Sequence, residues 1–157
     1  MKRVPSLLVL AVFSWALSGC TRESSAQSPP PESQFVVLNQ GAVPQNGLST
    51  KKQTKVLSSL AEYAAELAAY TNDPPLAIDF TPGKYLLVDM GGRSGGGYSI
   101  GVTSVDVADD SVRANVKLTK PGPTCVLLPV ITNPYQFIFI PSLKEVLVSE
   151  RVEIVNC

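Results

Sequence analysis

The sequence contains no histidine, and this absence narrows the chemistry open to the chain. Without histidine there can be no Ser-His-Asp or Cys-His nucleophile arrangement, and the commonest general base near neutral pH is missing. Zinc sites with imidazole ligands are excluded as well. The scattered carboxylates Asp79, Asp89 and Asp106 form no recognisable acid–base pair. We therefore expect no catalytic residue, no metal and no cofactor.

An excess of charge is also lacking. Lysine plus arginine and aspartate plus glutamate each number 13, so the formal net charge is zero. A nucleic-acid-binding protein normally carries a basic patch, and nothing here predicts one. The composition suits one globular domain of ordinary size.

No apolar run is long enough for a stable transmembrane helix, which needs about 20 residues. The longest is a short apolar stretch from Leu7 to Leu17, preceded by the charges of Lys2 and Arg3. A charged start, a short apolar segment and small residues before a cleavage site are typical of a secretory signal. We expect this segment to be removed.

The four residues Leu17-Ser18-Gly19-Cys20 resemble the lipobox of bacterial lipoproteins. The resemblance implies a signal peptide over residues 1–19 and acylation, with palmitate or similar chains, of Cys20. The alternative is an ordinary secretion signal with a chance cysteine. Two or more acyl chains anchor a protein stably to a membrane. Thr21 stands where an aspartate typically retains a lipoprotein in the inner membrane, so the outer membrane is favoured in a Gram-negative cell.

Residues 20–34 are rich in serine, proline and glutamine, with almost no apolar side chains. Such a segment cannot bury surface, and its prolines stiffen it. We expect a lipid anchor and tether over residues 20–34 and a single folded domain over residues 35–157.

Two of the three cysteines remain once Cys20 carries lipid. In an oxidising compartment an even remainder indicates a disulfide. We therefore predict that Cys125 pairs with Cys157, which would also hold the last residue in place. Two free thiols are the alternative.

One convincing helix is predicted. Ser59 followed by Glu62 has the pattern of a capping box, and Asp73-Pro74-Pro75 should end the helix. Four residues at helical spacing should form its buried face, namely Leu60, Ala64, Leu67 and Ala68. Glu62 and Glu66 lie one turn apart, and we interpret them as a solvated face rather than a metal or acid–base pair.

The rest of the domain has the alternation of β structure. Asn46-Gly47 is the strongest hairpin signal. Phe137 and Ile138 lie in a run that is apolar on both faces, which predicts a central strand. The expected strands are 35–38, 53–57, 84–90, 98–102, 112–118, 126–131, 136–140, 144–148 and 152–155. The predicted fold is α+β but mainly β: an antiparallel sandwich or open barrel with one packed helix.

Five glycines occur in the seven residues from Gly91 to Gly97. A phosphate-binding loop is excluded because the glycine spacing is wrong and a strand, not a helix, should follow. Glycine permits positive φ or close backbone approach, so a structural turn and a binding loop both remain open. Arginine and tyrosine are common interface anchors. The candidate partner-binding residues are Gly92, Arg93, Gly95, Gly96, Gly97 and Tyr98.

A family resemblance rests on this loop and its flanks. Ile78-Asp79-Phe80, the strand ending at Met90, Gly92-Arg93 and Gly96-Gly97-Tyr98-Ser99-Ile100 are similar to the C-terminal domain of the PrcB family. Two further pieces fit, Pro121-Gly122 and Thr132-Asn133-Pro134-Tyr135. The resemblance runs from Ala77 to Pro141. It departs at Ser94-Gly95, where the family usually has a Pro-Thr pair.

The family takes its name from a lipoprotein subunit of a spirochaete cell-surface protease complex. The resemblance therefore implies a non-catalytic accessory lipoprotein of the cell envelope that binds a protein partner, namely a secreted protease. One alternative is a protease inhibitor, because the Gly-Gly-Tyr loop resembles the wedge loops of chagasin-like inhibitors. Another is a structural envelope lipoprotein.

Overall fold

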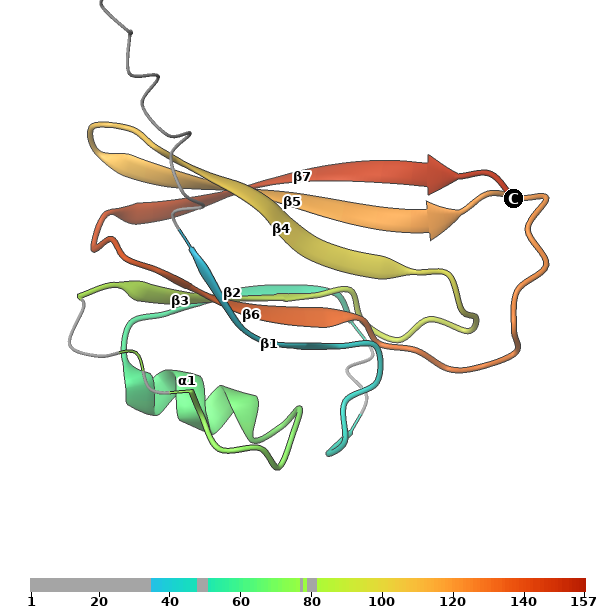
Figure 1. Cartoon of the computed structure of the whole chain (residues 1–157), viewed down its shortest axis with the longest axis horizontal. Coiled ribbons are helices and arrows are strands. Elements are labelled where there is room, and N and C mark those ends of the chain that lie inside the picture. Colours follow the sequence, from blue (N-terminus) through green and yellow to red (C-terminus); the bar gives the residue numbers. More distant parts are fainter. Residues whose placement is uncertain (1–34, 48–50, 77, 79–81) are drawn as a thin grey trace, which may run out of the picture. The chain divides into compact units, whose positions relative to one another are not determined.

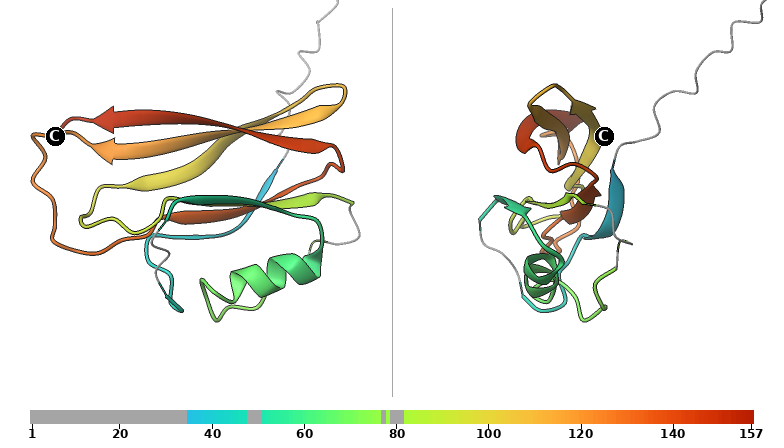
Figure 2. Two further views of the ribbon diagram at one scale, coloured as in Figure 1. Left: turned by 180° about the vertical axis from the view of Figure 1, so that it is seen from behind. Right: turned by 90° about the vertical axis from the view of Figure 1, so that its left-hand side faces the viewer.

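Strands dominate the part of the chain that the structure, a computed structural model, describes: residues 35–47, 51–76, 78 and 82–157. These residues all lie in the unit from Pro31 to Cys157. The unit has three layers: one helix, a four-stranded sheet and a three-stranded sheet (Figures 1 and 2). The elements are β1 Val36–Gly41, β2 Gln53–Leu57, α1 Leu60–Leu67, β3 Lys84–Asp89, β4 Ser99–Val107, β5 Ser111–Pro121, β6 Tyr135–Ile140 and β7 Glu145–Val155.

The middle layer is an antiparallel sheet in the order β1-β6-β3-β2. Every residue of β6 is buried, as are all residues of β3 after Lys84. Because side chains alternate along a strand, each of these strands supplies both neighbouring layers. The prediction of a central strand at Phe137 and Ile138 is confirmed.

Two separate cores result from this alternation. The aliphatic core lies between the two sheets, where Leu86 and Val88 of β3, Met90 just after it, and Ile138 and Ile140 of β6 pack against Val112, Ala114, Val116 and Leu118 of β5. The aromatic core lies between the middle sheet and α1, and consists of Leu57, Tyr63, Leu67, Tyr70, Tyr85, Leu87, Tyr135, Phe137 and Phe139. The strict alternation predicted for 112–118 is confirmed.

Helix α1 begins as predicted, since the Ser59 side chain accepts a hydrogen bond from the Glu62 amide at 3.1 Å. Its predicted end was wrong, because α1 ends at Leu67, before Asp73-Pro74-Pro75. Its predicted buried face was wrong in part, since Ala68 is exposed. Tyr63 and Leu67 are buried, whereas Leu60 is exposed, because the Tyr63 ring stacks on Tyr85 with centroids 4.8 Å apart. Burying the large Tyr63 ring orients the helix so that Tyr63, and not Leu60, faces the sheet. Within the described ranges no helix has the length and apolarity needed to cross a membrane.

The outer sheet has the order β4-β5-β7, and it contains a parallel pair. β4 and β5 form the expected antiparallel hairpin, but β5 and β7 run parallel over their full length. The chain leaves β5, crosses to the middle sheet as β6 and returns as β7 (Figure 1). The mainly β sandwich is confirmed, while an entirely antiparallel pairing is not.

Three expectations were wrong in detail. β1 and β2 pair with β6 and β3 rather than with each other, so Asn46-Gly47 makes no hairpin. The strands expected at 144–148 and 152–155 are one continuous strand, β7. The run 126–131 is not a strand but an irregular segment, in keeping with Pro129 inside it, which cannot donate to a ladder.

The aromatic core should contribute strongly to stability. Phe137 is fully buried and contacts the rings of Tyr63, Tyr70 and Tyr135 edge-on or tilted. We expect Phe137→Ala to lower the free energy of unfolding by about 3–5 kcal/mol, because it leaves a cavity between two layers. The exposed Val107→Ala should change it by less than about 0.5 kcal/mol. Chemical denaturation of both variants measures this, and equal effects would contradict a rigid aromatic core.

Candidate functional site

The glycine-rich loop between β3 and β4 is fastened to the segment that enters β6. The Met90 amide donates to the Pro134 carbonyl at 2.9 Å. Arg93 and Thr132 exchange two backbone hydrogen bonds of 2.7 and 2.9 Å. The loop is thus one side of a short two-stranded link rather than a free projection.

Two of the glycines are required by the backbone. Gly91 has φ 74°, and a Cβ there would lie 2.7 Å from backbone atoms of Lys51 and Lys52. Gly97 has φ 82°, a conformation that other residues rarely adopt. Gly96, by contrast, meets nothing closer than 3.8 Å, and its amide donates to the Leu128 carbonyl at 3.2 Å. The loop therefore has a structural side at Gly91 and an open side at Gly96.

A buried carboxylate, that of Asp89 at the end of β3, holds the base of this loop. Asp89 is fully buried and accepts hydrogen bonds from the Tyr70 hydroxyl at 2.6 Å and the Gly91 amide at 2.7 Å. Gln53 and Asn133 donate to it through their side-chain amides. Four donors from four different segments converge on one carboxylate, which satisfies it in the absence of water.

Tyr70 is fixed as a donor in this network. Burial raises the pKa of Tyr70 above its ordinary value, and the hydrogen bond to the Asp89 carboxylate raises it further. The hydroxyl therefore keeps its proton throughout the physiological pH range. Tyr70 ties the end of the helical region to the base of the loop, although it lies 19 residues from Asp89 along the chain.

Arg93 and Tyr98 lie together on the loop. The Arg93 guanidinium donates to the Met90 carbonyl and lies 5.9 Å from the centroid of the Tyr98 ring, within cation–π range. Tyr98 also lines a shallow hollow of about 360 Å³ beside Gln40, Gly41 and Tyr135. Arg93 thus contacts the backbone of the loop, whereas Tyr98 lines the hollow, and both side chains are partly exposed.

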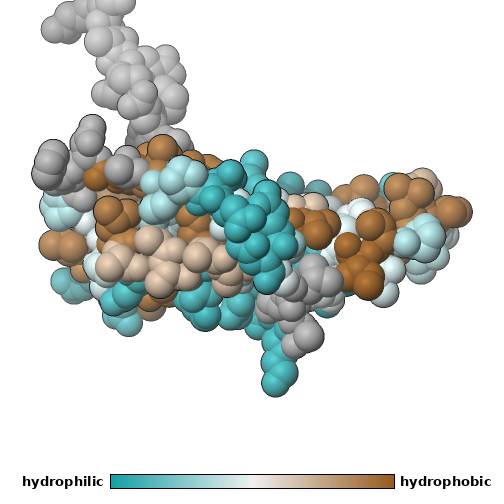
Figure 3. Space-filling model, turned by 90° about the horizontal axis from the view of Figure 1, so that it is seen from below, coloured by the Kyte–Doolittle hydropathy of each residue, from teal (hydrophilic) through white to brown (hydrophobic). Residues whose placement is uncertain are grey.

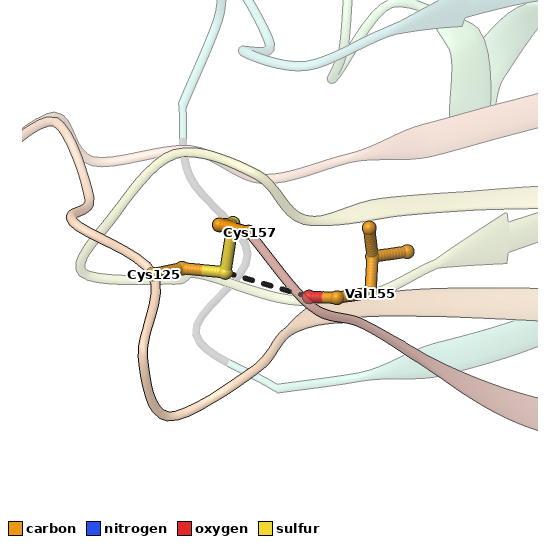
Figure 4. The surroundings of a disulfide bond; sticks show 3 residues. All are labelled: Cys125, Val155 and Cys157. Carbon is orange, nitrogen blue, oxygen red and sulfur yellow. Dashed lines mark hydrogen bonds between the residues drawn. A yellow bond between two sulfur atoms is a disulfide. The ribbon is translucent and has the colours of Figure 1, made fainter.

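The predicted disulfide between Cys125 and Cys157 is present, with Cα atoms 5.0 Å apart (Figure 4). It joins the irregular segment after β5 to the end of β7. The Gly122 amide donates to the Val155 carbonyl at 2.8 Å, which extends the β5–β7 ladder to this point. The Cys125 sulfur lies 3.4 Å from the same carbonyl oxygen, and since a disulfide sulfur has no hydrogen this is a packing contact.

Exposed hydrophobic side chains gather beside the disulfide. Val126 is 100% exposed and Leu128 is 74% exposed, and Figure 3 shows hydrophobic residues at this end of the molecule. They border a hollow of about 290 Å³ whose lining is mostly apolar. We call this surface the apolar tip, and its residues are Gly96, Gly97, Pro121, Val126, Leu127, Leu128, Val155 and Cys157.

The candidate loop and the disulfide therefore meet at one site. Gly96 and Gly97 line the apolar tip, while Gly95 lies against the Leu127 side chain. Gly92 and Arg93 belong to the base of the loop. Cys20 lies outside the described residues. That the loop binds a partner stays a prediction.

Sequence reasoning missed the apolar residues that give the tip its character. The sequence predicts a strand at 126–131, and that prediction gives no sign of a surface made of exposed side chains. Pro129 is the signal that could have revealed it, since proline within an apolar run argues against a central strand. Within the Gly-Gly-Tyr stretch the Gly96 amide is hydrogen-bonded to the Leu128 carbonyl, and the inhibitor alternative stays a prediction.

The apolar tip consists mainly of glycine and aliphatic side chains. Among the described residues no group of three or more histidine, cysteine, aspartate or glutamate side chains could hold a metal ion. The fold and site define a β-sandwich domain whose loops form an apolar surface at one end.

Comparison with protein families shows one similarity. Residues 84–141 match the family described as PrcB C-terminal, which confirms the PrcB-like resemblance over that part of the range 77–141. The match runs from β3 to just after β6 and includes the loop, Asp89 with its donors Gly91 and Asn133, and residues 122–134, while the donors Gln53 and Tyr70 lie outside it. No curated protein and no solved structure shows significant similarity to the chain.

The Asp89 network should be essential for the fold around the loop. Asp89→Asn replaces one acceptor oxygen with an amide that faces existing donors, and a buried donor left unpaired costs about 1–3 kcal/mol. We expect the free energy of unfolding to fall by about 2–3 kcal/mol. The exposed Asp110→Asn should have little effect. Urea denaturation tests the pair, and equal stabilities would show that the network contributes nothing.

The disulfide should stabilise the domain and order the tip. Replacing Cys125 and Cys157 together by serine should cost roughly 3–4 kcal/mol in the chain-entropy model. Amide hydrogen exchange should rise in residues 122–131 well before it rises in β6, because β6 is buried on both faces. The wild-type chain under reductant should behave like the double variant. Unchanged exchange at 122–131 would contradict the ordering role.

Proposed function

We propose that the chain is a non-catalytic accessory protein that binds a secreted protease through the apolar tip. The observation that carries this proposal is the exposure of Val126 and Leu128 beside a hollow lined by Gly96 and Gly97. Exposed apolar patches on a soluble domain are typical of protein interaction sites. Burying such side chains against a partner is favourable at about 25 cal/mol per Å².

The construction of the tip supports a binding role. A segment that only connected β5 to β6 would not need a row of exposed apolar side chains. Here the Cys125–Cys157 disulfide and the Arg93–Thr132 backbone pair hold that row in place from both sides. A surface ordered before binding loses less conformational entropy when the partner docks.

The family match supports the kind of partner. The matched residues 84–141 contain both halves of the tip, the glycine loop and the segment after β5. A PrcB-like domain suggests association with a protease complex. The third element of the tip, the end of β7, lies beyond the match. The Cys125–Cys157 disulfide joins it to the matched segment after β5.

The N-terminal residues complete the proposal. Acylation of Cys20 would anchor the protein to a membrane of the cell envelope, the outer one if the cell is Gram-negative. Residues 20–34 would then act as the tether. The accessory protein would hold a secreted protease at the cell envelope instead of letting it diffuse away.

A single charge in the tip should abolish partner binding without unfolding the domain. We expect Leu128→Asp to reduce recovery of the protease at least about tenfold, because a carboxylate would be desolvated in the interface. The matched control is Leu143→Asp. Leu143 is 67% exposed and lies in the β6–β7 connection at the opposite end of the domain (Figure 1). The measurement is affinity capture by the full-length chain from envelope extract of its own organism, followed by mass spectrometry and by binding of the purified partner.

Two outcomes would contradict parts of the proposal separately. If Leu128→Asp and Leu143→Asp capture the same protein as the wild type, the tip is not the docking site. If the tip-dependent partner is not a protease, the accessory-subunit assignment is wrong although the binding site stands. Replacing Arg93 and Tyr98 together by alanine adds a test of the loop itself.

A further inference from the structure

Strand β7 leaves a long open edge on the outer sheet. It pairs with β5 on one side only and forms the end of the order β4-β5-β7. Its eleven residues from Glu145 to Val155 are longer than a typical edge strand. An unpaired edge of this kind is a template for another strand.

The direction of the backbone groups along this edge is fixed. The Val155 carbonyl accepts a hydrogen bond from the Gly122 amide, so Val155 directs its backbone groups toward β5. In an extended strand the N–H and C=O of one residue point to the same side, and successive residues alternate. Glu150, Val152 and Ile154 therefore direct theirs to the open edge. Those residues can form the hydrogen-bonded positions of an added antiparallel strand.

The charges along the edge match those of a second copy. If two β7 strands pair antiparallel with Val152 opposite Val152, Arg151 of each chain faces Glu153 of the other. Arg151 lies beside Lys117 in its own sheet, and no ion pair of Arg151 is found among the described residues. Glu153 contacts Lys117 at 3.2 Å. Pairing would thus place the carboxylate of Glu153 from one chain opposite Arg151 of the other. Each Glu153 would then lie between Lys117 of its own chain and Arg151 of the second copy.

Registers that place a charged residue of β7 at the axis are poorer. Centring the pair on Glu150 would place two glutamates opposite each other, and like charges in that position are destabilising. The non-hydrogen-bonded registers centred on Arg151 or Glu153 oppose like charges as well. The register centred on Val152 instead brings together two apolar side chains that are each 53% exposed in the single chain. It also places Glu150 opposite Ile154, which is 62% exposed.

We propose that this protein self-associates through β7, forming a two-fold symmetric pair with Val152 at the axis. The sheet β4-β5-β7 then continues into the second copy as one six-stranded sheet. The contact is closed, because a two-fold interface uses each edge once and does not propagate into a filament. This inference does not rest on the protease partner.

Cysteine cross-linking in the full-length chain tests the register. Two residues that form a hydrogen-bonded antiparallel pair have Cα atoms about 5.5 Å apart, within disulfide range. We expect Val152→Cys to give a covalent dimer on mild oxidation with copper–phenanthroline, with the 152–152 link identified by mass spectrometry. The matched control is Val43→Cys, since Val43 is 52% exposed but lies outside the sheets, and this variant should stay monomeric.

A charge reversal and its compensation test the recognition. In the Val152→Cys background, Arg151→Glu places two like-charge pairs across the axis and should lower the cross-linked fraction about tenfold. Adding Glu153→Arg restores opposite charges in both pairs and should restore the yield. Both side chains are exposed, so unchanged circular dichroism and melting temperature will show that the fold is intact.

The proposal would be overturned by either of two results. The first is cross-linking of Val152→Cys no greater than that of Val43→Cys, or a dimer linked through Cys125 or Cys157 instead of position 152. The second is a failure of Glu153→Arg to rescue Arg151→Glu. Rescue in particular cannot come from a general effect on solubility, since the doubly exchanged chain has the composition of the original edge.

Discussion

A single buried carboxylate, that of Asp89, fixes the segments that lead to the glycine loop and the apolar tip. A charge without water must find hydrogen bonds inside the protein, and the groups that supply them are thereby fixed in space. Tyr70 and Gln53 come from the helical side of the molecule, while Gly91 and Asn133 come from the two segments that lead to the tip. The network therefore couples the aromatic core to the loop. The hydrogen bonds to Asp89 fix the base of the glycine loop, so the rest of the loop needs no regular secondary structure.

The path of the chain explains why the tip lies where it does. β5 and β7 run parallel, and parallel neighbours need a crossover connection, which here is β6 in the other sheet. The link from β5 to β6 must therefore travel from one sheet to the other at the end of the sandwich. Residues 122–134 make this passage outside both sheets, and their backbone pairing is confined to single contacts such as the Arg93–Thr132 bridge. The Cys125–Cys157 disulfide links this connecting segment to the end of β7 and thereby orders the surface that it forms.

The sequence pattern predicted those elements that depend on residues close together along the chain. The bounds of Gln53–Leu57 and the inward positions of β5 followed from alternation, and the Ser59 cap followed from its side chain. The pairing of β5 with β7 did not follow, because partners are chosen by packing between distant segments. Nor could any spacing show that Tyr70 reaches Asp89. The apolar run at 126–131 misled because hydrophobicity predicts burial, and here it is exposed at the tip.

The tip and the open edge share one strand, and this sets the geometry of a paired molecule. Val152 precedes Val155, the last residue of β7, by three residues (155 − 152), so in a two-fold pair each strand end lies about 10 Å from the axis at ~3.4 Å per residue. Because the strands are antiparallel, the two strand ends lie on opposite sides of the axis, about 20 Å apart. Each tip remains at the end of its own sandwich, free to take one partner. Two sites on one rigid sheet raise the effective concentration of the second binding event, so that a weak tip contact can still give firm attachment.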